Sequence, residues 1–292
     1  MLATVQLAID SLPSELRHLL GEQLTATGGA RLSAKHISTT CETLAISPRE
    51  LSLALLPVAA GFAYTPISHF HVGAIAWGES GDWYFGANME FNRQSLGQTI
   101  HAEQCAITHA WLSGETGLQA ITVNASPCGH CRQFMNETRS AGTLRIHLPG
   151  QEYSLQHMLP FAFGPTDLGI RDTLMCPQEA VLPAVAPDSL LELARDAAVR
   201  SYAPYSHSYA GAAIQAHDGR TFCGRYTENA AFNPSLPPLQ SALVMMRMAG
   251  YAPEAMVAAA LVEAEKGQIS HRAPSEALLQ AYGVDPLRYA AL

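Results

Sequence analysis

Charged side chains are scarce in this chain of 292 residues, where Asp, Glu, Lys and Arg together make up 14%. An average soluble domain has about 25%. A disordered chain needs charge in place of apolar residues, and here 48% of the residues are hydrophobic. Basic residues number 17 against 25 acidic ones, so the net charge is −8. A negative protein repels phosphate backbones, which favours a small uncharged ligand over a nucleic acid.

The chain also lacks a long apolar run and a dense set of cysteines. No stretch reaches the length of about 18 apolar residues that a membrane span needs. Residues 1–10 have no basic segment of the kind that opens a signal peptide. Of the six cysteines, only Cys128 and Cys131 are closely spaced. Scattered cysteines without an export signal indicate reduced thiols in the cytoplasm.

An internal repeat is the first positive feature. Residues 64–74 resemble residues 202–212, with Tyr, Pro, Ser, His, Gly and Ala at matching places. The same offset of 138 residues pairs Gly86 with Gly224. One gapless offset that serves widely separated matches indicates a duplication. It predicts a helical N-terminal segment (residues 1–48), a first copy (49–152), a connector rich in Pro and Gly (153–186) and a second copy (187–292).

Strand and helix patterns alternate within the first copy. Ser47, Pro48 and Glu50 predict a helix N-terminus with a capping box. We then expect a hairpin of residues 68–77 and 83–90, a helix at 101–112, a strand at 118–125, a helix at 127–138 and a strand at 144–148. This alternation implies a layered α/β/α domain with a mixed, largely buried sheet.

Metal-binding residues occur in two groups, His101-Ala102-Glu103 and, one strand later, Cys128 and Cys131 in the run 127–131. One imidazole and two thiolates are three zinc ligands, and catalytic zinc sites keep a fourth position open for water. Both groups begin predicted helices, where free N–H groups draw charge from the thiolates and keep zinc electrophilic. Glu103, two residues from the His ligand, is placed for proton transfer.

Structural, non-catalytic interpretations of these residues remain open. A structural zinc site needs a fourth ligand, and Cys105 is the candidate on the helix of His101. Cys105 points along that helix away from the cysteine pair, however, so we expect a small buried side chain. Glu103 would otherwise only complement a helix dipole. His109, on the same helix, is expected to be exposed or to cap it.

The second copy lacks the metal ligands at the repeat offset. Its counterparts are Leu239 for His101, Ser241 for Glu103, Lys266 for Cys128 and Ile269 for Cys131. Leu and Ile offer no donor atom, and Lys repels a cation. The second copy therefore keeps the fold without the metal, which predicts one Zn²⁺ per chain.

Together these motifs resemble the zinc-dependent cytidine deaminase family. H-x-E followed by P-C-x-x-C is the zinc deaminase signature, and residues 66–74, 86–91 and 228–234 extend the resemblance. The layout is similar to the longer, homodimeric class, with a helical N-terminal segment, one active domain and one degenerate domain. This resemblance implies hydrolytic deamination of cytidine and 2′-deoxycytidine in pyrimidine salvage, with release of ammonia and with Glu103 as the proton shuttle.

The resemblance also assigns substrate contacts. Asn88 and Glu90 match the positions that hydrogen-bond the ribose hydroxyl, and Phe70 matches the aromatic that stacks on the pyrimidine. Groups around Ala102 and Ser126 are expected to read the pyrimidine edge. The degenerate domain is expected to help close the partner's active site in a homodimer, and residues 229–237 are the candidate segment.

Alternatives to these assignments remain. Glu228 survives in the zinc-free copy, so Asn88 and Glu90 have a purely structural interpretation as a polar hairpin end, and Phe70 has one as plain core. A polynucleotide or nucleotide deaminase is a second enzymatic hypothesis, although net charge and Glu90 disfavour a phosphate ligand. A zinc-stabilised scaffold derived from a deaminase is the non-enzymatic hypothesis.

Overall fold

The computed structural model describes residues 1–292, and its N-terminal segment is helical as predicted, apart from one short strand. The elements are α1 (Ala3–Asp10), α2 (Ser14–Ala26), β1 (Arg31–Leu32) and α3 (Ala34–Leu44). Leu16, Leu20 and Leu24 recur every four residues on α2 and are buried. This apolar stripe faces the rest of the protein, as in other amphipathic surface helices.

The first copy contains a six-stranded sheet. Its elements are α4 (Pro48–Ala60), β2 (Gly73–Gly78), β3 (Trp83–Ala87), η1 (Leu96–Gln98), α5 (Ala102–Leu112), β4 (Leu118–Val123), α6 (Gly129–Met135), β5 (Arg145–Leu148), β6 (Gln151–Ser154) and α7 (Leu155–Met158). The strand order is β1-β3-β2-β4-β5-β6, and only β4 and β5 are parallel. The mixed sheet and the capping box of Ser47 with Glu50 are confirmed.

The second copy repeats the core of this arrangement. After η2 (Pro165–Leu168) in the connector, its elements are α8 (Ser189–Val199), β7 (Ala210–Ala216), β8 (Thr221–Arg225), α9 (Pro238–Met248), η3 (Pro253–Ala255), β9 (Met256–Glu263), α10 (Arg272–Ala281) and β10 (Arg288–Ala291). The order β10-β9-β7-β8, with β9 and β10 parallel, reproduces β5-β4-β2-β3. The duplication therefore holds at the level of topology.

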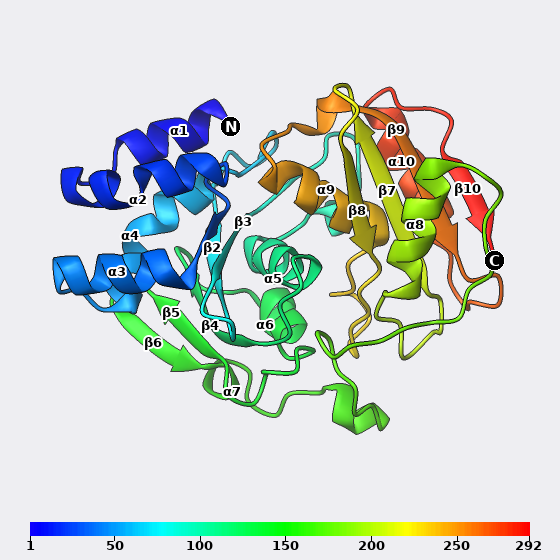
Figure 1. The fold of residues 1–292 in the computed structure, drawn as a ribbon. Coiled ribbons are helices and arrows are strands. Elements are labelled where there is room, and N and C mark those ends of the chain that lie inside the picture. The colour runs from blue at the N-terminus through cyan, green and yellow to red at the C-terminus, as the bar shows by residue number, and fades with distance from the viewer.

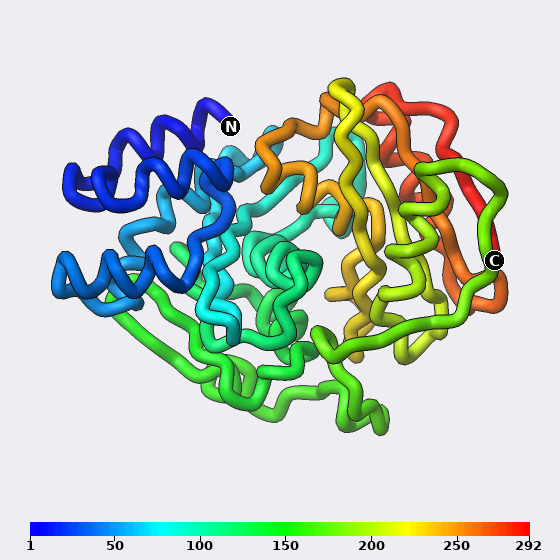
Figure 2. The backbone as a smooth tube through the Cα atoms, viewed as in Figure 1, coloured from blue at the N-terminus to red at the C-terminus, as the bar shows by residue number.

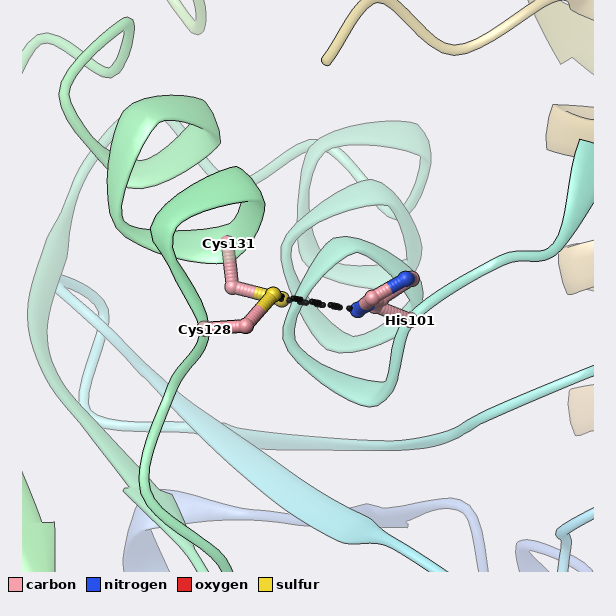
Figure 3. Close-up of side chains that lie close together, drawn as sticks. All are labelled: His101, Cys128 and Cys131. Atoms are coloured by element: carbon pink, nitrogen blue, oxygen red, sulfur yellow. Dashed lines mark hydrogen bonds between the residues drawn. The ribbon is translucent and has the colours of Figure 1, made fainter. Parts of the chain in front are cut away.

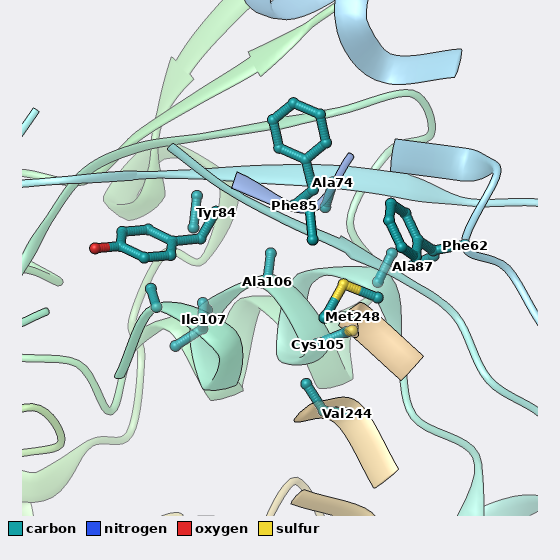
Figure 4. Packing of buried hydrophobic residues seen from close by; sticks show 14 of the residues in the cluster. Phe62, Ala74, Tyr84, Phe85, Ala87, Cys105, Ala106, Ile107, Val244 and Met248 are labelled. Carbon is teal, nitrogen blue, oxygen red and sulfur yellow. The ribbon is translucent and has the colours of Figure 1, made fainter. Parts of the chain in front are cut away.

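The two copies lie side by side, with helices between their sheets (Figure 1). α4 packs on β2 from the outer side, α5 and α9 contact each other between the sheets, and α8 packs on β7. The connector runs along one edge of the molecule from the first copy to the second (Figure 2). One continuous apolar cluster spans both copies, and part of it, around Cys105, Val244 and Met248, is drawn in Figure 4. No helix is both long and apolar enough to cross a membrane.

Paired glycines explain how closely the helices approach the strands. A Cβ on Gly86 of β3 would lie 2.2 Å from the Ala106 nitrogen of α5, and one on Gly224 of β8 would lie 2.1 Å from the Ala242 nitrogen of α9. Real Cβ atoms do not approach backbone atoms that closely. Glycine is therefore required at both positions, because helix and strand meet backbone to backbone.

The constant offset of 138 residues fails at the helices of the second copy. His101 is the N-cap of α5, whereas Pro237 is the N-cap of α9. Cys128 is the N-cap of α6, and His271 holds that place on α10. The predicted counterparts, which included Leu239 and Lys266, were therefore wrong because loops of the two copies differ in length. The loss of the metal ligands still holds, since His271 belongs to no His/Cys/Asp/Glu cluster.

Candidate zinc site

Two helix N-termini bring the three predicted ligands together. His101 precedes α5 and Cys128 precedes α6, both with extended backbone, and Cys131 follows in the first turn of α6. The spacing of three residues places both thiols on the side of α6 that faces His101 (Figure 3). The ligand atoms of these three residues all lie within 4.8 Å of one another.

The distances between the ligand atoms suit a tetrahedral zinc ion. Nδ1 of His101 lies 3.3 Å from Sγ of Cys131 and 3.5 Å from Sγ of Cys128, and the two sulfurs are 3.6 Å apart. Zinc bonds of about 2.3 Å to sulfur and about 2.0 Å to nitrogen separate tetrahedral ligands by roughly 3.5–3.8 Å. The chain therefore holds its ligand atoms almost where a tetrahedral zinc requires them.

A fourth side-chain ligand is missing from this group. Cys105 is fully buried in the apolar core beside Met248, and burial raises the pKa of its thiol to about 12 (Figure 4). The expectation of a small buried side chain at Cys105 is confirmed. Because no side chain closes the tetrahedron, the three ligands match the open form of catalytic zinc sites.

Glu103 is buried beside the ligands, with 4% of its surface exposed. The thiol of Cys131 donates to Oε2 of Glu103 at 3.2 Å. Burial raises the pKa of the Glu103 carboxyl above its ordinary value. A carboxyl group in such surroundings takes up and releases protons closer to neutral pH than a solvated one does.

His130, between the two cysteines, contacts the metal ligand His101. Its ring stacks on that of His101, with centroids 4.8 Å apart and planes inclined by 29°. This contact packs one face of the His101 imidazole and restricts its rotation. The sequence alone does not reveal this stacking, because it is a tertiary contact between two helix N-termini.

Asn88 lies next to the ligands through backbone pairing. Met89 and Ile100 exchange two hydrogen bonds of 2.9 Å in an antiparallel bridge, which places Asn88 opposite His101. The Asn88 side chain accepts from the Val72 nitrogen at 2.9 Å and donates to the Phe70 carbonyl at 2.9 Å. It therefore fixes the loop that carries Phe70.

Glu90 holds the same loop from its other end. Its carboxylate accepts from the backbone nitrogens of Ile67 and Ser68, each at 2.9 Å, and from the Ser68 hydroxyl. Glu228 makes the equivalent bonds to Tyr205 and Ser206 in the second copy. A shared structural role thus explains why this glutamate survives without zinc.

Phe70 lies in a loop and not in the predicted strand, because β2 begins only at Gly73. The side chains of Ser68, Asn88 and Glu90 bind the loop backbone, and these bonds replace strand pairing. The Phe70 ring is 61% exposed, so the interpretation as plain core is wrong. The ring is free to contact a ligand.

The last two expected contacts differ in burial. Ala102 is buried at the start of α5, whereas Ser126 is exposed. Arg132 donates to the Pro127 carbonyl at 2.8 Å and reaches the Ser126 hydroxyl at 3.4 Å. Arg132 thereby holds the segment that leads into Cys128. The expectation that His109 is exposed or caps its helix was wrong, since it is buried and its Nδ1 lies 2.9 Å from the carbonyl of Phe85 in β3.

Fold and site together define an α/β zinc hydrolase with an open ligand position beside a buried carboxyl group. Two regions, residues 49–145 and 155–276, each match the family model "Cytidine and deoxycytidylate deaminase zinc-binding region". The chain is 50% identical over 294 residues to a cytidine deaminase of Photobacterium profundum, covering 100% of both chains. It is 49% identical over 288 residues to one of Vibrio vulnificus, covering 98% of each.

Among solved structures, a cytidine deaminase of Burkholderia pseudomallei matches at 30% identity and a TM-score of 0.36, covering 39% of this chain and 98% of that one. The full-length relatives decide the assignment. The chain belongs to the cytidine deaminase family, in its long form with two deaminase regions and zinc ligands only in the first.

Proposed function

We propose that this chain deaminates cytidine and 2′-deoxycytidine hydrolytically to uridine and 2′-deoxyuridine, with release of ammonia, as a step of pyrimidine salvage. The main support is the set of three ligand atoms at tetrahedral spacing with the buried Glu103 beside them. Full-length relatives named cytidine deaminase support the substrate. In this proposal residues 49–152 are the catalytic unit, 153–186 the connector and 187–292 the zinc-free unit.

Each proposed site residue has a separate task. His101, Cys128 and Cys131 would hold zinc, which would act as a Lewis acid and lower the pKa of a water towards about 7. Glu103 accepts a proton from the attacking water, places it on the ring nitrogen beside C4, and gives the second proton to the leaving amine. Such general acid–base catalysis is typically worth about 10²- to 10⁴-fold.

The remaining contacts orient the nucleoside. Phe70 stacks on the pyrimidine, and groups at Ala102 and Ser126 read its edge. Asn88 and Glu90 bind the ribose hydroxyl while they also hold the Phe70 loop. A carboxylate has about four acceptor positions, so the three bonds that Glu90 makes within the protein leave room for a hydroxyl donor.

The proposed assembly is a homodimer in which residues 229–237 help close the partner's active site. An exposed Phe232 in this segment supports an apolar contact with a second chain. All six cysteines are free thiols, which supports a reducing compartment such as the cytoplasm as the place where the enzyme acts.

The test compares wild type with Glu103→Gln for zinc content and for absorbance loss on cytidine. We expect one zinc in both proteins and a turnover number lower by about 10²- to 10⁴-fold in the variant. Unchanged turnover would instead support a different proton carrier or a zinc-stabilised scaffold. Wild type is also assayed on deoxycytidine monophosphate, and faster turnover of this nucleotide would replace the nucleoside with a nucleotide as substrate.

A further inference from the structure

Glu137, just after the cysteine-bearing helix α6, is a buried carboxylate that the proposed reaction does not use. It is fully buried, and it accepts from the Tyr202 hydroxyl at 2.6 Å, from the Tyr205 hydroxyl, and from the Ala230 nitrogen at 2.9 Å. All three donors belong to the zinc-free copy. A buried charge needs such a complete set of donors, so the contact fixes its partners precisely in space.

Ala230 belongs to residues 229–235, which we call the Phe232 loop. The catalytic copy holds this loop at two further points. The Asn229 amide donates to the Gln133 carbonyl of α6 at 2.9 Å, and the Gln104 amide of α5 donates to the Pro234 carbonyl at 2.9 Å. The base of the loop is therefore bound to the two helices whose N-termini carry the zinc ligands.

The tip of the loop presents an aromatic ring to solvent. Phe232 is 66% exposed and has a φ of +61°, a conformation uncommon for a bulky residue. Hydrogen bonds within the loop hold it there: its nitrogen donates to the Asn229 carbonyl at 2.9 Å, and the Ser235 nitrogen donates to the Phe232 carbonyl at 2.8 Å. Strain of this kind persists only where the surroundings enforce it, and it often marks a functional position.

We propose that Glu137 is a positioning residue that holds the Phe232 loop of one protomer in place for the nucleoside pocket of its partner. The inference rests on the proposed homodimer and its active-site closure. It gives the zinc-free copy a defined role, because the cysteine helix of each protomer then supports the pocket of the other.

Kinetics of Glu137→Gln test this role. An amide has one acceptor oxygen where the carboxylate has two, so it loses either the Ala230 contact or the tyrosine contacts. We expect the KM for cytidine to rise by about 3- to 10-fold, as the loss of one hydrogen bond would give, with kcat and zinc content nearly unchanged. Tyr202→Phe is the matched control, since it removes one donor and leaves Ala230 bound; its KM should change less.

Mixed dimers separate positioning from simple structural support. Two tagged chains are co-expressed, one inactivated by Glu103→Gln. With Glu137→Gln on the inactive chain, the active site faces an impaired loop and its KM should rise. With Glu137→Gln on the active chain, KM should stay at the wild-type value. The reverse pattern would overturn the proposal, because Glu137 would then act on its own site.

A double-mutant cycle with Phe232→Ala completes the test. If Glu137 acts through Phe232, adding Glu137→Gln to Phe232→Ala raises KM no further, whereas independent effects multiply and contradict the inference. An unchanged KM in Phe232→Ala, or a wild type that is monomeric, would sink both active-site closure and this inference while leaving deamination intact. A wild type inactive on cytidine would show instead that the proposed function is wrong.

Discussion

A single thiol decides whether the candidate site retains its metal. Cys128 supplies one of three ligand atoms, and two ligands bind zinc far more weakly than three. We expect Cys128→Ala to be purified with less than about a tenth of the wild-type zinc. Cys105→Ala is the control, because that thiol is buried in the core four residues after His101; it should keep its zinc. Metal analysis of both variants decides, and full zinc in Cys128→Ala would mean that the ligand set is wrong.

Burial of His109 makes the free energy of unfolding depend on pH. The pKa of His109 is lowered to about 4, chiefly by burial; the bond to the Phe85 carbonyl opposes this shift, and nearby Arg31 adds to it. The His109 ring also packs against the Tyr84 ring in a T-shaped arrangement. The folded pKa lies below the unfolded value of about 6.5, so the unfolded chain binds more protons in between. The free energy of unfolding therefore falls as pH falls from about 6.5 towards 4.

Between pH 6.5 and 5 this histidine should contribute a loss of about 1.5 kcal/mol. His109→Gln keeps a donor for the Phe85 carbonyl and does not titrate. Urea unfolding of wild type and variant at several pH values in this range measures the difference. An equal pH slope in both proteins would contradict a neutral His109 in the folded state.

At the scale of elements, local patterns predicted the central layers well. The second hairpin strand, α5, β4, α6 and β5 were predicted within a few residues, because alternation, helix caps and the Cys spacing are local signals. The first hairpin strand was predicted from residue 68 but begins at Gly73. The short strand β1 and the edge strand β6 were missed, since two- and four-residue strands form only through pairing with distant partners.

In the candidate site, too, local sequence signals were predictive and long-range contacts were not. His101, Cys128 and Cys131 were predicted together from their spacing, and the structure brings them together. The loop position of Phe70, the stacking of His130 and the contacts of Glu137 depend on partners far away in the sequence. A constant repeat offset could not reveal that His271 stands at the place of Cys128, because loop lengths differ between the copies.

The glycine pair offers a test in which the second copy serves as control for the first. Gly86→Ala and Gly224→Ala introduce the same backbone clash, and overpacking of this kind costs about 1–3 kcal/mol. Both should lower Tm by several degrees. Only Gly86→Ala displaces α5, which carries His101 and Glu103, so only it should also lower kcat strongly. Thermal unfolding and steady-state kinetics compare the two, and equal loss of kcat would contradict the separate roles of the copies.

At the scale of the whole molecule, the two copies share one core and are not independent domains. Arg247 of α9 donates to the Phe62 carbonyl at 2.7 Å and to the Ala63 carbonyl at 2.8 Å, directly after α4. Glu137 makes the opposite connection, from the first copy to the second. The second copy is therefore still needed for the packing of the first, although it lacks the catalytic ligands. Because the two copies share one core, we expect the whole chain to unfold cooperatively.

Removal of zinc should test this organisation. The ligand atoms are already at tetrahedral spacing and, of the three ligands, only Cys131 belongs to the apolar core, so a chelated chain should stay folded. Zinc at 1,000 times its Kd stabilises the folded state by about 4 kcal/mol. At about 2–4 °C per kcal/mol, chelation should lower Tm by roughly 10 °C in one transition. Titration of zinc into the chelated protein, followed by circular dichroism and metal analysis, should restore Tm at one ion per chain. Saturation at two ions per chain would contradict the prediction, because it would require a second zinc site in the second copy. His271 stands there at the place of Cys128 and belongs to no group of metal-ligating side chains.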